Sequence, residues 1–573
     1  MADAPQKRHG PPPGLYPEIL GAYFRQLIAP LRSFWRRTWF YRRLLKGRLS
    51  DHILFYPFDA EPRRLEDADA FLRGRFRLGG ELADLRGGGS VFDARPPSQS
   101  WAEALHRFDW LPPLAAAGGE PARVLATNLI GQWIKRNGRY SEPAFLPHIL
   151  ARRLVRLFAH SRFVLTDADV LWRSKFFVSL REQSKLLARL AASAPEGVAR
   201  FEAAAALALS GACLDDSPAR LDAGMKRLDE EIARQILPDG GHVSRSPESL
   251  LHAYRSLIMV LDALKARDVQ PSATQRSAQD RIAPMLRFFR HGDGALALFN
   301  GGAEGDARMI AALLARDEVR GQPFAHARHS GYQRLVAGRM IAILDCGVPP
   351  PGAFSNNAHA GCLAFEFSSG QQRVVVNCGS ARASHPDWET ALRATAAHST
   401  VTLADQSMAR VLSEGFARDL IGARLLGGPI EVDSRRIETA NGWSVEAHHD
   451  GYVREFGVLH ERRLTLSPNG LVLTGADRLI PRARAAQAIP FAIRFHIHPD
   501  VRLSPSESGS IVLKLPNGEG WRFRASGTPA IEESVYLGTG QVRRTEQIVV
   551  TSAVKDSPVE TGWVFEQIGA AAQ

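Results

Sequence analysis

The chain contains little cysteine and no long apolar run. Four cysteines occur in 573 residues and none forms a CxxC pair, so the sequence indicates neither a disulfide framework nor a thiolate zinc site. No apolar run reaches the roughly 18–20 residues that span a bilayer, and residues 1–13 lack the apolar core of a secretory signal. We therefore expect buried free thiols, no membrane-spanning helix and no export signal.

Motifs for nucleotide and hydrolase chemistry are also missing. No GxGxxG turn follows a strand, and the patterns GxxxxGK[ST], HExxH and GxSxG do not occur. The sequence therefore predicts no nucleotide cofactor.

The charged residues are biased toward arginine. The chain has 72 Lys and Arg, of which only 9 are Lys, against 60 Asp and Glu, which gives a net charge of +12. This charge suits an acidic partner such as a uronate polysaccharide, a nucleic acid or an anionic membrane. The arginine excess is also typical of a GC-rich bacterial genome. Nucleic-acid binding has no support beyond the net charge and one basic segment, so we expect no nucleic-acid partner.

That basic segment spans residues 16–50. Its arginines are Arg25, Arg32, Arg36, Arg37, Arg42, Arg43 and Arg48, and they alternate with Tyr23, Phe24, Phe34, Trp35, Trp39, Phe40 and Tyr41. The composition is compatible with a basic amphipathic helix that makes peripheral contact with an anionic membrane. A helix that packs its aromatic face on the body of the protein is the alternative.

Apolar periodicity divides the rest of the chain into two parts. Helical spacing dominates residues 102–315, with helices expected at 145–159, 171–190, 198–209, 218–236, 249–266 and 275–289. From residue 330 onward, short alternating runs separated by turn residues predict an antiparallel β-sandwich. We expect an N-terminal segment (1–50), a helical domain (51–318) and a sandwich domain (319–573).

The residues with the most chemistry lie in the β part. Asn357, His359, Asn377 and His398 each lie near the end of a β run, where they could converge at one sheet edge. Two imidazoles can bind zinc, but two ligands are too few and an amide is a poor third ligand. The pattern leaves a metal site and a proton-transfer site open.

Several motifs of this chain occur in the order found in the heparinase II/III family of polysaccharide lyases, which the chain therefore resembles. The resemblance rests on residues 356–367, 374–379 and 395–401 and on further pieces at 101–114, 235–242, 450–452 and 457–463. It implies an α+β multidomain fold in which an α/α-toroid, an incomplete helical barrel, precedes an antiparallel β-sandwich. It also implies β-elimination at a uronic acid, and hence an acidic polysaccharide as the partner.

The site residues that the resemblance implies match only in part. Candidate catalytic residues are His242, Tyr254, Asn357, His359 and His398, candidate substrate-binding residues are Arg245 and His252, and candidate ligands of one zinc ion are His359, Asn377 and His398. Ser249 replaces the family's catalytic Tyr, Glu196-Gly197 stands where an Asn-His pair is usual, and Asn377 replaces a carboxylate.

These departures leave more than one function open. The first is a divergent carbon–oxygen lyase that cleaves uronic-acid-containing glycans. The alternative is a catalytically silent glycan-binding or structural envelope protein on the same scaffold. The resemblance favours the cell envelope or periplasm, whereas the lack of an export signal leaves the cytoplasm open.

Overall fold

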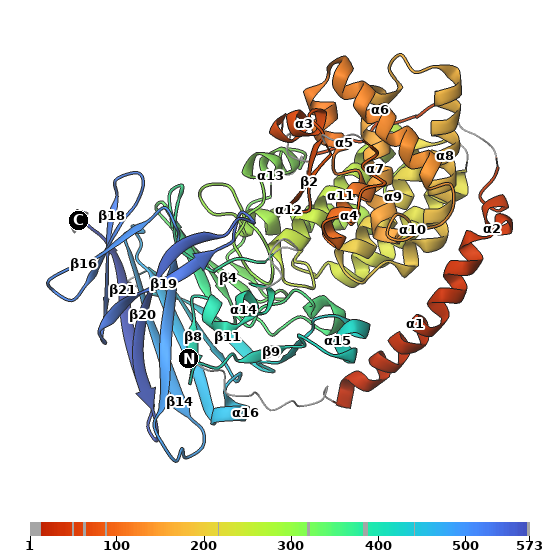
Figure 1. Cartoon of the computed structure of the whole chain (residues 1–573). Helices are drawn as coiled ribbons and strands as arrows, with labels where there is room; N and C mark the ends of the chain where they lie inside the picture. The colour runs from red at the N-terminus through yellow and green to blue at the C-terminus, as the bar shows by residue number, and fades with distance from the viewer. Residues whose placement is uncertain are drawn as a thin grey trace.

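The computed structural model describes residues 13–47, 51–60, 65–85, 89–215, 217–317, 321–381, 388–439 and 442–569. Helices make up the first part of the chain and antiparallel sheets the second, and the two parts lie side by side (Figure 1). The predicted fold class, a helical toroid followed by an antiparallel sandwich, is confirmed.

Hairpins of long helices build the helical part. Its helices are α3 (Leu65–Leu72), α4 (Gln99–Arg107), α5 (Leu111–Ala117), α6 (Gly119–Arg136), α7 (Pro147–Leu165), α8 (Val170–Leu190), α9 (Val198–Cys213), α10 (Pro218–Gln235), α11 (Pro247–Ala266), α12 (Ala273–Phe288) and α13 (Ala307–Leu314). The alanine-rich helix α9 is buried along most of its length. Glycine lets α10 approach it closely, because a Cβ at Gly224 would lie 2.3 Å from the backbone nitrogen of Ala208.

Two sheets form the second part. One has the order β11-β12-β13-β14-β21-β18-β17-β16 and the other β19-β20-β15-β7-β6-β5-β4-β3, with β8 beside β15. The first sheet consists of β11 (Val432–Thr439), β12 (Gly442–His449), β13 (Val458–Leu466), β14 (Val472–Pro481), β16 (Arg502–Pro505), β17 (Ile511–Lys514), β18 (Gly520–Ala525) and β21 (Val559–Gln567). The second consists of β3 (His326–Ala327), β4 (Tyr332–Ala337), β5 (Met340–Asp345), β6 (Phe365–Ser369), β7 (Gln372–Val376), β8 (Val401–Leu403), β15 (Ile489–Ile497), β19 (Pro529–Tyr536) and β20 (Arg543–Val554).

Short elements decorate this frame. They are the hairpin β1 (Arg75–Leu78) and β2 (Glu81–Asp84), the strands β9 (Ala409–Val411) and β10 (Leu425–Gly427), and the helices α14 (Glu389–Arg393), α15 (Phe416–Ile421) and α16 (Val453–Phe456). The hairpin was not expected from the sequence, and α16 occupies part of a segment, residues 454–459, that the sequence predicts as a strand. The change from helix to strand lies between Leu314 and His326, and the predicted boundary at residue 318 falls outside the described residues.

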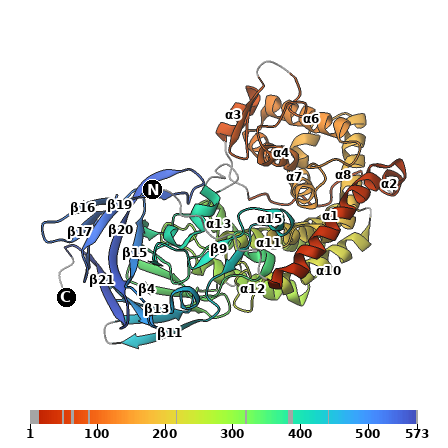
Figure 2. The same cartoon turned by 60° about the horizontal axis from the view of Figure 1, so that its bottom comes forward.

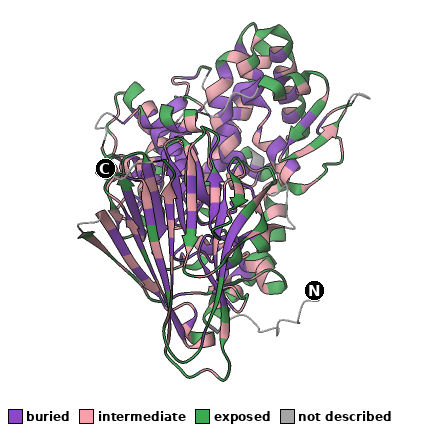
Figure 3. Cartoon of the chain, turned by 90° about the vertical axis from the view of Figure 1, so that its left-hand side faces the viewer, coloured by how far each residue is buried: buried purple, intermediate pink, exposed green. Residues whose placement is uncertain are grey.

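A buried ion pair lies at the centre of the sandwich. Arg462 donates to both carboxylate oxygens of Asp477, at 2.7 and 3.0 Å, and to the backbone carbonyls of Leu363 and Ser399, at 2.7 Å each. Both charged side chains are inaccessible to solvent. Figure 3 shows the buried residues along the middle of the strands. All four cysteines are free and buried, as expected.

The N-terminal segment forms a strap outside the helical part, made of α1 (Tyr16–Arg37) and α2 (Trp39–Arg43). At one end Glu18 pairs with Arg424, and the Tyr23 ring lies 5.8 Å from Phe416 in α15. At the other end, three basic side chains of α8 donate to backbone carbonyls of residues 44–47. Figures 1 and 2 show α1 running between these two attachments.

The aromatic side chains of the strap face solvent. Phe24, Phe34, Trp35, Trp39 and Phe40 are between 52% and 71% exposed, whereas Tyr41 is buried. Most of this face therefore does not pack on the body of the protein as the alternative expected, although Tyr23 contacts Phe416. Arg48 lies outside the described residues. Among the described helices, none has the length and apolar character needed to cross a membrane.

The central ion pair predicts a large effect of one substitution. Arg462→Met is expected to lower the free energy of unfolding by about 3–5 kcal/mol, because it leaves the buried Asp477 carboxylate without its cation. Chemical denaturation measures this loss. The matched control is Arg478→Met. Arg478 follows Asp477 in β14 and faces solvent, so this substitution should change stability by no more than about 0.5 kcal/mol. Equal effects of the two variants would contradict the assignment.

Candidate functional site

The two halves of the chain meet at Arg245, in the turn before α11. The residue adopts a left-handed backbone conformation with φ of 59°. Its guanidinium donates to the backbone carbonyls of Ser330, Gly331, Gly347 and Val348, at 2.8 to 3.2 Å, and to the carboxylate of Asp345. All of its N–H donors are therefore used within the protein. The structure contradicts the substrate-binding role expected of Arg245.

Asn300 connects this junction to the histidine-bearing loop. Its side-chain nitrogen donates to the Tyr332 hydroxyl at 3.0 Å and to Asp345 at 3.4 Å, while its oxygen accepts the backbone N–H of His359 at 3.4 Å. The next residue, Gly301, has φ of 78°, and a Cβ there would lie 2.4 Å from the backbone oxygen of Asn357. Sequence reasoning missed Asn300, whose only signal was its place before two glycines.

His359 and His398 form one unit, as their positions at the ends of β runs suggested. Nδ1 of His359 lies 3.0 Å from Nε2 of His398, and Nδ1 of His398 lies 2.9 Å from the carbonyl oxygen of Ala394. A carbonyl only accepts, so His398 carries its proton on Nδ1 and accepts on Nε2. His359 must then donate from Nδ1. Its Nε2 keeps a lone pair with no hydrogen-bond partner among the described residues.

Burial makes both imidazoles weak bases. It lowers the pKa of His398 to about 4. The pKa of His359 is also held well below its usual value, by burial first and then by His398 and Arg393 nearby. Their side chains are almost fully enclosed, since His359 is 8% exposed and His398 only 2%. The pair is therefore neutral at physiological pH.

The residues expected to bind zinc do not fit that ion. The facing nitrogens of the two imidazoles form a hydrogen bond with each other, and the Asn377 side-chain oxygen accepts the backbone N–H of Ser399 at 3.0 Å. The Asn377 side-chain nitrogen donates to Glu366 at 3.1 Å. No group of three or more His, Cys, Asp or Glu side chains suited to a metal occurs within the described part of the chain. Three available ligands and an open position are therefore not assembled here.

His242 and Tyr254 lie apart from this pair in roles that the sequence did not predict. Nδ1 of His242 accepts the backbone N–H of Ser244 at 3.1 Å, and Nε2 lies 2.9 Å from the Gln235 side-chain oxygen. Burial lowers the pKa of His242 to about 3. Tyr254 is fully buried in the core of the toroid, and burial raises its pKa. Neither group presents a reactive atom to a substrate.

The turn that contains His242 instead fastens the two domains together. Asp239 accepts the backbone N–H groups of His329 and Ser330 at 2.9 and 2.7 Å. The same carboxylate accepts the backbone N–H of Gly241 through its other oxygen, at 3.0 Å. The match between residues 235–242 and the family pattern thus corresponds to a domain contact in this chain.

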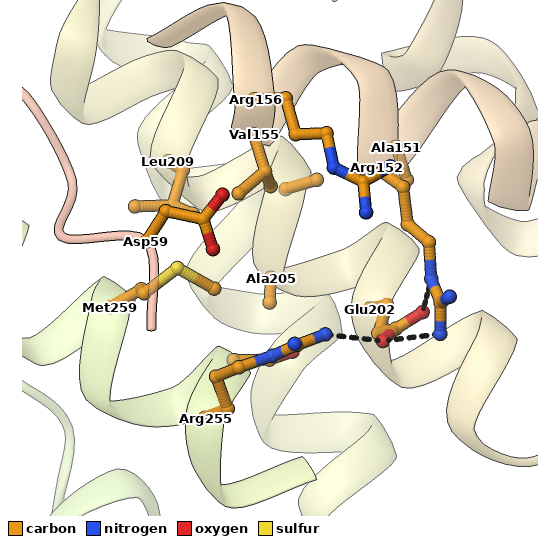
Figure 4. Close-up of a pocket in the computed structure, with 12 residues that line it drawn as sticks. Asp59, Ala151, Arg152, Val155, Arg156, Glu202, Ala205, Leu209, Arg255 and Met259 are labelled. Carbon is orange, nitrogen blue, oxygen red and sulfur yellow. Dashed lines mark hydrogen bonds and ion pairs between the residues drawn. The ribbon is translucent and has the colours of Figure 1, made fainter. Parts of the chain in front are cut away.

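Paired charges fill the interior of the toroid (Figure 4). Arg152 donates to both oxygens of Glu202 at 2.7 and 3.0 Å, and Arg255 lies 3.6 Å from the same carboxylate. Although burial alone would raise the pKa of Glu202, the surrounding cations lower it to about 2. His252 lies at the edge of this cluster, 4.0 Å from Glu248, and burial followed by Arg255 lowers its pKa to about 4.

The cavity beside these charges is small. Its volume is about 30 Å³, which corresponds to about one water molecule. Arg156, on its wall, donates to Asp109 and to the backbone of Arg107. A sugar ring does not fit in this space. Two larger cavities, of about 420 and 300 Å³, lie along β13, β14, β18 and β21 and beneath the strap.

Two further site residues lie on the surface of this region. Asn357 is exposed beside the buried imidazole pair. Ser249 is partly buried in the first turn of α11, where its backbone N–H is capped by Ser246 at 3.4 Å. A serine hydroxyl at this position cannot replace a phenol in proton transfer, because its pKa is far higher than that of tyrosine.

Comparison with known sequences identifies relatives of the chain. Residues 319–564 match the family described as Heparinase II/III-like, C-terminal. The chain is also 34% identical over 554 residues to the FtsZ-localized protein C of Caulobacter vibrioides, an alignment that covers 93% of this chain and 94% of that protein.

Solved structures share the architecture. Heparinase III superposes with a TM-score of 0.70 at 15% identity, over 97% of this chain and 92% of that one. The heparan sulfate lyase HepC of Pedobacter heparinus superposes with a TM-score of 0.56 at 17% identity, over 92% and 87% of the two chains. At these identities the comparison establishes a common fold.

The neutral imidazole pair predicts how stability depends on pH. In the unfolded chain a histidine titrates near pH 6.5, whereas folding lowers the pKa of His398 to about 4. The unfolded state binds more protons between these values, so stability should fall as pH drops from 6.5 to 4. His398→Asn is expected to remove up to about 3 kcal/mol of this fall.

Urea denaturation across this pH range measures the slope. The exposed His329→Asn variant is the matched control and should follow the wild type. A His398→Asn protein with the full wild-type slope would contradict the assignment. Treatment with EDTA should leave the wild-type melting temperature unchanged, since a direct hydrogen bond, rather than a metal ion, joins the two imidazoles.

Proposed function

This chain belongs to the heparinase II/III-like family and is a homologue of FtsZ-localized protein C, and we propose that it is a catalytically silent protein on a polysaccharide lyase scaffold that works beside FtsZ. The observation that carries the proposal is the closed imidazole pair, in which His359 donates to His398 and both rings are buried. The chain has the fold of a polysaccharide lyase, and the closed pair supports the proposal that it does not perform the lyase reaction.

The chemistry of β-elimination explains why this pair is a poor catalyst. A base must take the proton at C5 of a uronic acid, and an acid must protonate the leaving oxygen. The only free lone pair of the imidazole pair is on Nε2 of His359, whose pKa is held far below its usual value, so it attracts a proton weakly. Two residues considered for the acid do not suit that role, because Ser249 stands at the position of the family's phenol and Tyr254 is buried in the toroid core.

The relative's name supports a place of action. The relative is named for its localisation with FtsZ, and four buried free thiols are usual for a reducing compartment such as the cytoplasm. We therefore favour the cytoplasm over the periplasm. Cleavage of uronic-acid-containing glycans, which the fold relatives suggest, is the result that would argue for the lyase function instead.

The silent site predicts the outcome of a direct assay. Incubation of the purified chain with heparan sulfate, chondroitin sulfate and alginate should produce no ultraviolet-absorbing unsaturated ends, and a fluorescent fusion in the producing bacterium should co-localise with FtsZ. Unsaturated products that disappear in the His359→Ala variant would contradict silence. A diffuse fusion protein would contradict the division-site role.

The strap supports a second element of the function, peripheral contact with an anionic membrane. Eight exposed side chains of α1 lie on one face, which spans an arc of about 140° at 3.6 residues per turn. They are Leu20, Tyr23, Phe24, Leu27, Ile28, Leu31, Phe34 and Trp35, each between 39% and 71% exposed. So large an apolar face on one surface helix indicates a contact beyond the chain itself.

Charge favours a lipid surface as that contact. Arg25, Arg32 and Arg36 lie together along one border of the apolar face, where they can meet anionic headgroups while the apolar side chains enter the acyl boundary. The opposite side of α1 carries the attachments, since Ala22 is buried and Glu18 pairs with Arg424. The apolar face is thus free to lie on a membrane without detaching α1.

This contact predicts binding to lipid vesicles. The chain should co-sediment with vesicles that contain phosphatidylglycerol more strongly than with pure phosphatidylcholine, and less strongly as salt is raised. Phe24→Asp/Leu31→Asp should weaken binding by about tenfold or more, since each substitution removes an exposed apolar side chain that would insert into the lipid. The matched control is Gln26→Asp/Ser33→Asp, which adds the same charge on the polar face and should bind nearly as well. Equal loss in both would contradict insertion of the apolar face.

A further inference from the structure

A cavity of about 300 Å³ lies where the end of the strap meets the helical part. It is enclosed by the α1–α2 turn on one side and by α6, the loop after α6, and α8 on the other. We propose that this cavity binds the phosphate-bearing headgroup of an acidic phospholipid. The inference rests on the proposed membrane contact and adds to it a specific site for one lipid molecule.

The cavity has an apolar floor and a basic wall. Tyr41, Leu45, Trp133, Phe145 and Leu186 form the apolar lining, and all five are buried. Arg36, Arg37 and Arg139 contribute three guanidinium groups against one carboxylate, Glu182. The combination of an apolar floor with an excess of arginine suits a phosphodiester carried on a glycerol backbone, because guanidinium forms paired hydrogen bonds with phosphate oxygens.

Neighbouring contacts hold this wall in place. The Arg36 guanidinium lies 5.3 Å from the centre of the Tyr140 ring and donates to its hydroxyl at 3.3 Å. On the floor, the Trp133 indole donates to His106 at 3.0 Å. Behind it, Gln183 accepts from the buried Arg153 at 2.7 Å and donates to Ser179 at 3.0 Å. The floor and Arg36 are therefore held in place within the protein, whereas Arg37 and Arg139 are exposed.

The position of the cavity favours a lipid over a soluble anion. It opens beside Trp39, which is 61% exposed, and Arg36 and Arg37 end the helix whose outer face carries the exposed apolar side chains. Trp39 lines the cavity and follows the exposed Phe34 and Trp35 along the chain, so acyl chains that leave the cavity past Trp39 would meet this face at the headgroup level of the bilayer. Aromatic side chains such as Trp35 and Trp39 prefer that depth of a bilayer.

Calorimetry with a short-chain lipid tests the site without a membrane. Monomeric dihexanoyl-phosphatidylglycerol should bind the full-length chain with one site, and dihexanoyl-phosphatidylcholine should bind markedly more weakly. Arg36→Gln/Arg139→Gln should weaken binding of the acidic lipid by at least about tenfold, because charge-assisted hydrogen bonds are lost. Arg73→Gln/Arg75→Gln removes the same charge from two exposed positions outside the cavity lining and should bind as the wild type does. Ser179→Trp should block the cavity without changing its charge.

Several results would overturn the proposal. Equal weakening in the two arginine double variants would indicate general charge attraction rather than a site. Displacement of the lipid by an equal concentration of inorganic phosphate would identify a free anion as the ligand, and displacement by a poly-glutamate peptide would identify an acidic protein segment.

Vesicle sedimentation separates this inference from the membrane contact itself. If the chain binds vesicles but the arginine pair at the cavity does not affect short-chain lipid binding, the headgroup site is wrong and the membrane contact stands. If short-chain lipid binds and the cavity variants abolish it while the chain ignores vesicles, the site stands and the membrane contact is wrong.

Discussion

A buried guanidinium needs an acceptor for each of its N–H groups, and Arg245 finds them only where the toroid meets the sandwich. Four backbone carbonyls and the Asp345 carboxylate satisfy it, and the Tyr332 ring covers its face at 4.9 Å. These carbonyls belong to turns of the second domain, so the side chain fixes the relative position of the two parts. A Cβ at Gly347 would lie 2.4 Å from the Arg245 guanidinium, so any side chain there would force Arg245 to move. Through Asp345 and Asn300 the same network reaches the backbone of His359.

Apolar periodicity predicted the long elements well and the site less well. The helices α7 to α12 begin and end within a few residues of their predicted bounds, because each has a regular apolar stripe. Convergence of His359 with His398 also followed from their positions at the ends of β runs. The burial of Tyr254 could not be predicted in this way, since periodicity shows which side of a helix is apolar but not that α11 is enclosed on all sides. The role of Arg245 could not be read either, because its acceptors are backbone atoms of distant turns.

Several buried polar groups of the second domain stabilise the fold. Glu366 is inaccessible to solvent and accepts from His291, Leu298 and Asn377, which joins the loop after α12 to the second sheet. Arg373 contributes a similar contact through Asp293. Removing one of these buried groups is strongly destabilising, because the partner that remains is left buried and unpaired. A scaffold can therefore keep its architecture through these contacts while the groups that meet a substrate diverge.

The strap has a mechanical consequence for the molecule as a whole. Helix α1 has 22 residues, which makes it about 33 Å long, and it is fastened to both domains, through Glu18 to Arg424 on the sandwich side and through Arg36 to Tyr140 on the toroid side. A continuous helix does not stretch, so it acts as a strut that sets the separation of its two anchors. Rotation of one domain against the other must therefore bend α1 or break an anchor. Any load on the outer face of α1 is shared by both domains at once.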